Sequence, residues 1–353
     1  SHNCYTLYPF QANTYGLPKE IIKDCLQGFF TAQLQKAVHT ANNFKDWLLH
    51  TFGKGICENF MFPYNEKFWQ IDLNEITHNY ASRYIPRPKI EDVIAGALGL
   101  SQEEMGYNAK FYYPEKGGIG SIANAFEKSL KIKTDCGVTL TSIDIQNKIA
   151  TLDNGRMIQY EHCISSIPLP LLIQKIHAQQ NIQNCSDTLK SIYITYWDIL
   201  VKNPSYHKED YHWIYYPEEQ YPFHRIGSYS SADSDAVPSK EYRSYYVETS
   251  HLRKDSMKSS QSKMLQALND LGIILKNDEV LEIRQSTIDQ AYVIFDHHYA
   301  ENRKIILQYL QEHQIHSIGR YGGWQYNAME NGILDGKRTA ELINKKDKEI
   351  YEI

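Results

Sequence analysis

The sequence predicts an α/β protein, α+β overall, in which helical and strand-rich segments follow one another along 353 residues. Three observations support this class. Apolar residues recur at helical spacing through about the first 105 residues, alternate with polar residues in several segments between 138 and 250, and return to helical spacing near the C-terminus. The order of helical, mixed, mostly β and again mixed segments predicts that elements from the two ends of the chain share one sheet.

The N-terminal part is predicted to be mostly helical. Leu17-Pro18 places a proline where a first helical turn tolerates it, and apolar residues recur at helical spacing through residues 17–37. A second apolar stretch, Phe44–Phe60, is interrupted by Gly53-Lys54-Gly55. A further helix is expected over Ile90–Leu100, because its first turn is acidic.

The segment from 107 to 190 is predicted to mix strands with a helix. The expected elements are a helix from Ser121 to about Leu130, a strand over Val138–Ile145, and a hairpin of Ile149–Leu152 and Met157–Tyr160 around Asp153-Asn154-Gly155. Cys163–Ile167 is expected to be a short buried strand that Pro168 and Pro170 end.

The rest of the chain is predicted to be β-rich and then mixed again. Strands are expected over Ile192–Val201 and Tyr242–Val247, with a polar loop over Ser228–Lys240. The later elements are a helix marked by Met264, Leu265, Leu268 and Leu271, a helical stretch that starts at Ile305–Leu310, a strand-to-loop transition over Ser317–Gly323, and a final helix from about Met329 to Asn344.

Composition excludes several classes of protein. Hydrophobic residues make up 42% and charged residues 22%, so a disordered or collagen-like chain is excluded. The net charge of −5 includes no basic surplus, so no nucleic-acid partner is expected. No apolar run approaches the ~20 residues of a membrane helix, and Ser1-His2-Asn3 does not open a signal peptide. Six isolated cysteines without a Cys-x-x-Cys pair are typical of reduced thiols, so a cytoplasmic protein is expected.

Tyrosine is the residue whose frequency is unusual, with 27 Tyr against 12 Phe. Because tyrosine combines an apolar ring with a polar tip, two interpretations stay open. One is a core and surface of more polar character, and the other is a wet, aromatic-lined ligand cleft.

One glycine motif matches the pattern G-x-G-x-x-G/A: Gly118-Ile119-Gly120-Ser121-Ile122-Ala123. Glycines ahead of a helix let backbone N–H groups approach a phosphate. A dinucleotide fingerprint follows a strand, however, and Pro114 breaks the segment before this motif. A dinucleotide fingerprint, a glycine loop near another ligand and a plain tight turn all remain open.

Other catalytic signatures are absent from the sequence. It contains no G-x-x-x-x-G-K-[ST], no G-x-S-x-G and no H-E-x-x-H, which argues against a P-loop, an α/β-hydrolase and a zincin. His297-His298 and the pair His313 and His316 have no evident third ligand, so no metal site is expected. No catalytic residue is identified on these grounds.

Two arginines and a C-terminal glycine stretch are the strongest candidates for a site. Arg225 and Arg320 lie among aromatic residues and glycines, which suits binding of an anion or diphosphate as well as a structural salt bridge. In Gly319–Gly336, three glycines surround a strand end before a helix that begins near Met329. Such a helix presents N–H groups and a positive dipole end to an electron-rich ligand atom.

At this stretch the sequence resembles FAD-dependent oxidoreductases of the amine oxidase and protoporphyrinogen oxidase type, and it looks closest to the branch similar to UDP-galactopyranose mutase. The segments that carry the resemblance, in the order of the family, are Tyr8–Asn13, Pro63–Trp69, Ile85–Pro88 with Glu91–Ile94, Tyr113-Pro114 with Gly117–Gly120, Ser165–Pro170, His212–Glu218 with Pro222–Arg225, and Ala291-Tyr292. Together with the C-terminal stretch, the resemblance runs from about Tyr8 to Ile343.

The resemblance implies an incomplete Rossmann-like FAD-binding part and a helical and mixed β-sheet substrate part. The implied divisions are 1–108, a mostly helical substrate or cap region; 109–190, a Rossmann-like FAD-domain segment; 191–312, a β-rich substrate domain; and 313–353, a C-terminal FAD-domain segment. The implied FAD contacts are Gly118, Gly120, Val138, Gly319, Arg320, Tyr321, Gly322, Met329 and Glu330. The candidate substrate contacts are Trp213, Tyr215, Arg225 and Tyr292.

One feature departs from the family pattern. The family begins with a strand, a G-x-G-x-x-G turn, a helix and an acidic residue for the ribose, and this sequence has no equivalent before Tyr8. Three interpretations follow: a truncated chain, one half of a split protein whose partner supplies the other FAD-binding half, and a relative that no longer binds FAD.

The leading hypothesis is an FAD-dependent oxidoreductase or a UDP-galactopyranose-mutase-like sugar-nucleotide enzyme, with a small-molecule substrate such as a nucleotide sugar. In such enzymes the cofactor carries the chemistry, which explains the absence of a catalytic triad or metal motif. The alternative is a non-catalytic, flavin-free binding or partner protein derived from this family. A third hypothesis is a protein that binds NAD through Gly118–Ala123.

Overall fold

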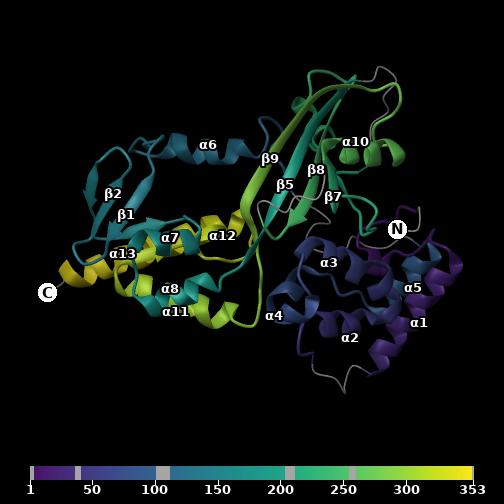
Figure 1. Ribbon diagram of the computed structural model, residues 1–353, viewed down its shortest axis with the longest axis horizontal. Helices are drawn as coiled ribbons and strands as arrows, with labels where there is room; N and C mark the ends of the chain where they lie inside the picture. Colours follow the sequence, from purple (N-terminus) through teal and green to yellow (C-terminus); the bar gives the residue numbers. More distant parts are fainter. Residues whose placement is uncertain (1–3, 36–40, 101–111, 203–210, 254–259, 352–353) are drawn as a thin grey trace. The chain divides into compact units, whose positions relative to one another are not determined.

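The structure, a computed structural model, describes residues 4–35, 41–100, 112–202, 211–253 and 260–351 (Figure 1). Its helices and strands alternate as an α/β protein, so the predicted class is confirmed. The chain divides into two compact units: Ser1–Leu130 with Ile192–Asp289, and Lys131–Ser191 with Gln290–Ile353. We call these the first unit and the second unit. The four divisions expected from the sequence stay predictions, and part of the 108/109 boundary region lies outside the described residues.

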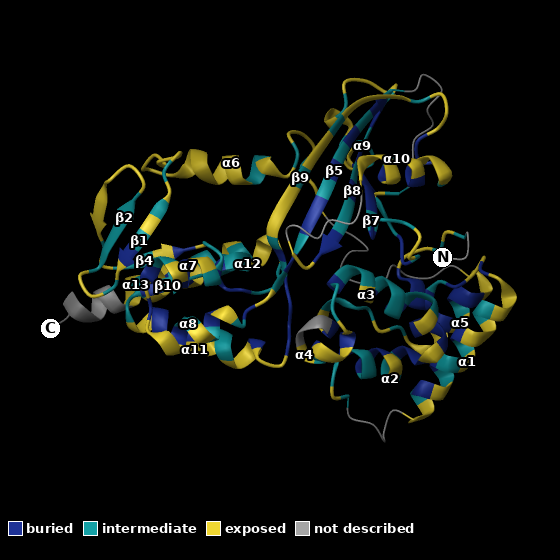
Figure 2. Ribbon diagram, in the orientation of Figure 1, coloured by how far each residue is buried: buried dark blue, intermediate teal, exposed yellow. Residues whose placement is uncertain are grey.

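The first unit begins with helices, as predicted in general for the N-terminal part, although α3 and α4 were not individually predicted. They are α1 (Lys19–Gln35), α2 (Phe44–Ile56), α3 (Phe62–Trp69), α4 (His78–Ala81), α5 (Ile90–Leu98) and α6 (Gly120–Ser129). Asn43 caps α2, because its side-chain oxygen accepts a hydrogen bond from the Asp46 N–H at 2.8 Å. α6 has no buried residue, and Figure 2 shows it almost entirely exposed.

The glycines that interrupt the second apolar stretch let α1 and α2 touch through their backbones. Gly53 has φ 75° and kinks α2. A Cβ on Gly53 would lie 2.0 Å from the carbonyl oxygen of Gly28, and one on Gly55 would lie 2.1 Å from that of Asp24. Both positions therefore require glycine.

The β-rich half of the first unit is a five-stranded sheet with the order β6-β7-β8-β5-β9. The strands are β5 (Ser191–Lys202), β6 (Trp213–Tyr215), β7 (Arg225–Ser228), β8 (Tyr242–His251) and β9 (Glu279–Val293), whose last residues belong to the second unit. Two of the strands extend the predicted ones, whereas β9 was not predicted. The predicted loop 228–240 contains two short helical turns, α9 (Tyr229–Ala232) and Ser234–Ala236.

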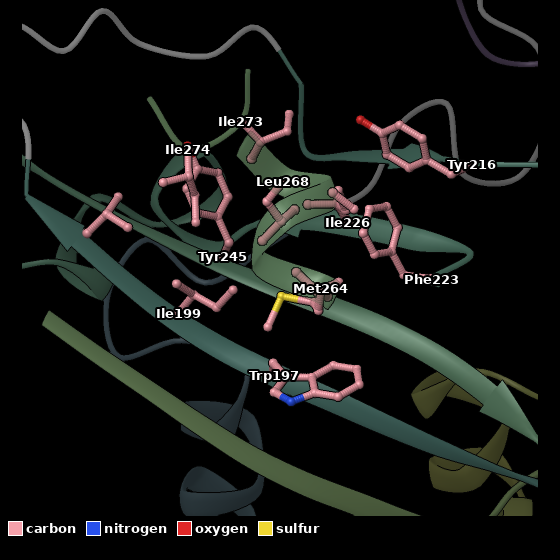
Figure 3. Close-up of a cluster of buried hydrophobic side chains, with 13 residues drawn as sticks. Trp197, Ile199, Tyr216, Phe223, Ile226, Tyr245, Met264, Leu268, Ile273 and Ile274 are labelled. Carbon is pink, nitrogen blue, oxygen red and sulfur yellow. The ribbon is translucent and has the colours of Figure 1, made fainter. Parts of the chain in front are cut away.

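One face of this sheet packs against α10 (Gln261–Asp270), which the spacing of Met264 and Leu268 predicts. Trp197 and Ile199 of β5, Tyr245 of β8 and Ile226 of β7 meet α10 in a cluster of fully buried side chains (Figure 3). Alternate residues of each strand point to this face, as the period of a strand requires. The opposite face carries both charged and aromatic side chains, among them Arg225, Glu248 and Tyr215.

The second unit contains the predicted hairpin and a parallel pair of strands. Strands β1 (Leu140–Asp144), β2 (Ile149–Leu152) and β3 (Met157–Gln159) form an antiparallel sheet, with Gly155 at φ 81° in the turn. β4 (Cys163–Ser165) pairs in parallel with β10 (Ile315–Ser317). A segment from the middle of the chain therefore shares a sheet with a C-terminal one. The described residues of the N-terminal part contribute no strand to it.

Helices precede and follow the two parallel strands along the chain, and some of them begin where the sequence predicted a loop or a break. They are α7 (Leu169–Ile176), α8 (Gln180–Asp187), α11 (Tyr299–Glu312), α12 (Gly319–Gly322) and α13 (Met329–Tyr351). Pro168 and Pro170 do follow β4, but they also begin α7, since proline is tolerated in a first helical turn. The expected loop after β10 is instead one turn of helix, α12.

Candidate functional site

The predicted C-terminal site is a tightly bonded turn between β10 and α13. Gly319 has φ 75° and opens α12. The N–H groups of Gly323, Trp324 and Gln325 then donate to the carbonyls of Gly319, Tyr321 and Arg320 at 2.8, 3.1 and 2.9 Å. The backbone of this turn is thus almost fully paired before α13 begins.

Arg320 holds the turn together rather than pointing a free guanidinium at a ligand. Its Nη2 donates to the Ala291 carbonyl at 2.8 Å and its Nη1 to the Asn327 carbonyl at 3.2 Å. The guanidinium carbon lies 4.7 Å from the ring centroid of Tyr292 and 4.8 Å from that of Tyr326, both within cation–π range. The structure therefore brings together a predicted cofactor residue, Arg320, and a predicted substrate residue, Tyr292.

Three further side chains brace the same turn. The Tyr299 hydroxyl donates to the Trp324 carbonyl at 2.7 Å, and Arg303 Nε donates to the Gly323 carbonyl at 2.5 Å. Asp335, on the second turn of α13, accepts from the Gly319 N–H at 3.3 Å. Side chains braced in this way keep a binding geometry fixed before a ligand arrives.

Two buried donors of this turn have no acceptor. Within the described part of the chain, Nε1 of Trp324 and Nδ2 of Asn327 are buried and make no hydrogen bond. A buried N–H without an acceptor costs about 1–3 kcal/mol, so native structures rarely keep one without a reason. Trp324 also has φ 46°, which only a few per cent of non-glycine residues adopt. Such strain is concentrated at functional sites.

The other predicted residues of this stretch differ in what surrounds them. A Cβ on Gly319 would meet nothing within 4 Å, whereas one on Gly322 would lie 2.7 Å from the Ser165 carbonyl oxygen. Gly322 is thus required by packing, and Gly319 faces open space. Tyr321 is half-buried, while Met329 and Glu330 are exposed in the first turn of α13. The positive end of that helix is accessible to a ligand.

The remaining predicted cofactor residues do not have the expected context. Gly118 and Gly120 lie in the first unit, and the described residues before them, 112–119, form no strand. The strand–turn–helix geometry of a dinucleotide fingerprint is therefore not seen in that stretch. Val138 belongs to the second unit, but it precedes β1, which starts at Leu140 rather than at 138 as expected.

Three of the four predicted substrate residues lie on one face of the sheet in the first unit. Tyr215 of β6 pairs with Arg225 of β7, which pairs with Glu248 of β8, so these three side chains form one row. Trp213 lies two residues from Tyr215, on the same face. This face is opposite the core of Figure 3, because Ile226 and Val247 point to the other side.

Arg225 forms a structural salt bridge, which is one of the two roles that the sequence left open for it. Its Nε and Nη2 donate to Oε2 and Oε1 of Glu248 at 2.6 and 2.7 Å, a bidentate pair. Burial alone would raise the pKa of Glu248, but the charge and hydrogen bonds of Arg225, together with His224, outweigh it and lower that pKa to about 2. The charge of Arg225 is thus largely offset by the carboxylate of Glu248.

His224 and Lys67 are polar residues near this row that the sequence analysis missed. His224 Nε2 lies 3.5 Å from Glu248 Oε2, and burial lowers the pKa of His224 although Glu248 opposes the shift. Lys67 of α3 donates to the carbonyls of Tyr216 and Glu218 at 2.9 and 2.6 Å. Burial lowers the pKa of Lys67 to about 8, against the raising effect of Glu218.

Aromatic rings of α3 cover part of the same face. The ring centroid of Tyr64 lies 5.0 Å from that of Tyr215, and Phe68 lies 5.3 Å from His224. Tyr64 and Phe68 lie in the Pro63–Trp69 segment, which carries part of the family resemblance. That motif is the sequence feature that could have identified them as site residues. The aromatic-lined interpretation of the tyrosine content fits this face.

The described residues show neither a cluster of possible metal ligands nor a helix suited to cross a membrane. Among the described residues, no group of three or more His, Cys, Asp or Glu side chains could hold a metal ion. None of the described helices is both long enough and apolar enough to cross a membrane. All six cysteines are free thiols, with Cys25 and Cys57 buried.

Solved structures with a similar fold include a reduced UDP-galactopyranose mutase, with a TM-score of 0.81 and 24% identity over 90% of this chain and 70% of that chain. A putative protoporphyrinogen oxidase from Exiguobacterium sp. 255-15 matches with a TM-score of 0.64 and 12% identity over 94% of this chain and 73% of that chain. A CLA-producing fatty acid isomerase from P. acnes matches with a TM-score of 0.56 and 11% identity, over 92% and 74%. No protein-family model matches the sequence. These similarities confirm the fold that the resemblance implies.

Proposed function

We propose that this chain is an FAD-dependent oxidoreductase or a UDP-galactopyranose-mutase-like sugar-nucleotide enzyme. The observation that carries the proposal is the braced turn before α13, where Nε1 of Trp324 and Nδ2 of Asn327 are buried without an acceptor. An electron-rich ring system with carbonyl and ring-nitrogen acceptors would satisfy such donors. The flavin ring is a group of this kind.

The residues of this turn fit a flavin by their chemistry and by the room around them. Gly319 leaves open space where a side chain would stand, and the first turn of α13 offers N–H groups and a positive dipole end. When bound, the flavin would supply the electron transfer or the nucleophilic ring chemistry of the enzyme. Arg320, Tyr299 and Arg303 would fix the turn against which it lies.

Fewer of the described residues are suited to bind the diphosphate of FAD. Gly118 precedes α6 and Gly120 begins it, without a strand in the stretch 112–119, so their geometry does not favour a diphosphate cradle. A protein partner that supplies a strand, a glycine turn and a helix would provide this cradle. This part of the proposal covers the split-protein interpretation of the sequence.

The substrate side is proposed to be the face that carries Trp213, Tyr215 and Arg225. Its aromatic rings suit a base or a sugar, which stack on aromatic side chains. The bidentate pair with Glu248 offsets the charge of Arg225, so recognition of a diphosphate would need a further cation. A nucleotide sugar remains the proposed substrate class, and a cytoplasmic location stays a prediction from the sequence.

One observation favours the alternative function, a flavin-free binding protein. Arg320, expected along the flavin, already bonds two carbonyl groups and contacts two tyrosine rings of its own unit. A protein that keeps this turn for stability alone would retain the same contacts. The alternative is separated from the main proposal by flavin binding.

The test is the visible absorption spectrum of the purified chain before and after addition of FAD, followed by gel filtration. We expect a flavin band to stay with the protein. Trp324→Phe should weaken flavin affinity about tenfold, because the substitution removes one neutral N–H donor whose hydrogen bond contributes about 1.4 kcal/mol to binding. Trp197→Phe is the matched control, since its Nε1 is also buried without a partner but lies in the core of the first unit.

A colourless protein that does not bind FAD would contradict flavin binding by this chain alone, and would leave the flavin-free alternative and a chain whose FAD cradle comes from a partner. Equal affinities of Trp324→Phe and Trp197→Phe would remove Trp324 from the flavin site. Binding of reduced nicotinamide that is lost in Gly118→Ala with Gly120→Ala would favour the NAD hypothesis instead.

A further inference from the structure

β9 is a long edge strand whose first eleven residues are exposed or only partly buried, with Ile283 packed against the core cluster of the sheet. It is the last strand of the sheet order β6-β7-β8-β5-β9, and only one neighbour, β5, is bonded to it among the described residues. From Glu279 to Asp289 none of its residues is buried, and Figure 2 shows it mostly exposed beside the buried β5. Long exposed edges present unpaired N–H and C=O groups to other chains.

The side chains of this edge are not all of the kind that protects an edge from pairing. Val280, Leu281 and Ile288 are 38%, 44% and 40% exposed. Charges on an edge usually repel an approaching strand. Here the two charges in the middle, Glu282 and Arg284, are of opposite sign and form an exposed ion pair at 2.8 Å.

We infer that β9 pairs in antiparallel fashion with β9 of a second copy of this chain, with Ile283 at the two-fold axis. In this register Glu282 of each copy lies opposite Arg284 of the other, and both side chains are on the same face because they are two residues apart. Oppositely charged residues that face each other across two strands stabilise the pair. The two copies would form one continuous sheet.

The neighbouring registers are disfavoured by the same charges. An axis at Glu282 would place two glutamates opposite each other, and an axis at Arg284 would place two arginines opposite each other. Like charges directly opposite each other destabilise a strand pair. With the axis at Ile283, residues 279–287 face themselves in reverse order, and no like charges are directly opposed.

The expected complex is weak and depends on salt. A single pair of strands buries less than the roughly 1,200–2,000 Å² of a standard interface, so we expect a dissociation constant on the order of 10 μM. Exposed charge pairs are screened, so the dimer should weaken as ionic strength rises. The inference does not depend on flavin binding, because all the residues it uses lie in the first unit.

Sedimentation equilibrium of the full chain, from about 2 to about 200 μM, tests the inference. The wild type should approach twice the 41.1 kDa of one chain. Glu282→Arg and Arg284→Glu should each weaken dimerisation about tenfold or more, because like charges then face each other. The double variant, and an equimolar mixture of the two single variants, should dimerise like the wild type.

An exposed ion pair of α1 provides the matched control. Lys23 and Glu20 lie 3.1 Å apart and are similarly exposed, and their charge reversal should leave dimerisation unchanged. A wild type that stays monomeric at about 200 μM overturns the inference. So do single variants that dimerise as well as the wild type, which would place a dimer interface elsewhere, and a mixture that fails to restore the dimer.

Discussion

Arg225 and Glu248 face each other across β7 and β8 and form a bidentate ion pair, with nitrogen–oxygen distances of 2.6 and 2.7 Å. The pair lies on the face that carries Tyr215 and Trp213. His224 touches the same carboxylate from the residue before Arg225. The electrostatics of the proposed substrate face therefore depend on Glu248, which carries the largest number of these contacts.

Acidification should destabilise the protein through Glu248. The unfolded carboxyl takes up its proton near pH 4.5 and the folded one only near pH 2. Between these values the unfolded state binds more protons, so the free energy of unfolding falls as pH is lowered from 4.5 towards 2, by up to about 1.4 kcal/mol per pH unit. Urea unfolding followed by tryptophan fluorescence at several pH values measures this slope.

Glu248→Gln should flatten that pH dependence, because glutamine does not titrate. It should also lower the stability at pH 7 by about 2 kcal/mol, since Arg225 loses a charged partner. A variant with the wild-type slope would show that other carboxyl groups, and not Glu248, cause the loss of stability in acid.

Arg320→Ala should destabilise the second unit whether or not flavin is present. The guanidinium donates two hydrogen bonds and lies over two tyrosine rings, so its loss should cost about 3 kcal/mol. Arg320→Lys should recover only part of this, since an ammonium group cannot bond both carbonyls and stack on both rings in the same way. Chemical denaturation of the apoprotein is the measurement.

Arg338→Ala is the control for this substitution, because Arg338 lies on α13 with an exposed side chain and a long contact of 3.9 Å to Asp335. We expect a change within about 0.5 kcal/mol. If Arg320→Ala changed the stability as little, the hydrogen bonds and ring contacts of Arg320 would not contribute measurably to the free energy of unfolding.

Alanine at Gly53 or Gly55 should disrupt the contact between α1 and α2. The added Cβ would lie 2.0 or 2.1 Å from a carbonyl oxygen of α1, so the helices must separate. We expect each substitution to cost more than about 3 kcal/mol, in the range that marks severe packing damage. Gly332→Ala should instead stabilise by about 0.5–1 kcal/mol, since its surroundings are open and it lies within α13. Thermal unfolding compares the three variants, and equal melting temperatures would refute the close contact.

Much of the fold could be predicted because its elements carry their own pattern. The hairpin around Asp153-Asn154-Gly155 and the helices α1, α5 and α10 all show the spacing or turn residues that their burial requires. β9 could not be predicted in this way. From Glu279 to Asp289 no residue is fully buried and only Ile283 packs against the core cluster, so no regular alternation of apolar and polar residues is imposed on it.

The sequence predicted which segments form the candidate site, but not which residues contact one another within it. The glycines and Arg320 mark the turn before α13, and family motifs mark the face with Arg225. The partner of each arginine is set by strand register: Glu248 faces Arg225 because β7 and β8 pair at those residues. Register depends on contacts between distant segments, which local sequence patterns do not contain. The buried N–H groups of Trp324 and Asn327 likewise become visible only once the chain is folded.

The parallel pairing of β4 with β10 has a consequence for the order in which the protein is made. Cys163–Ser165 must wait for Ile315–Ser317, and residues 192–289 of the first unit lie between them. On the ribosome the first unit is therefore complete before β10 has been synthesised, while β4 in the early half of the second unit still lacks its strand partner. Closing so long a loop is slow. The second unit is thus the last to mature, and its early half is the part of the nascent chain most in need of protection by a chaperone.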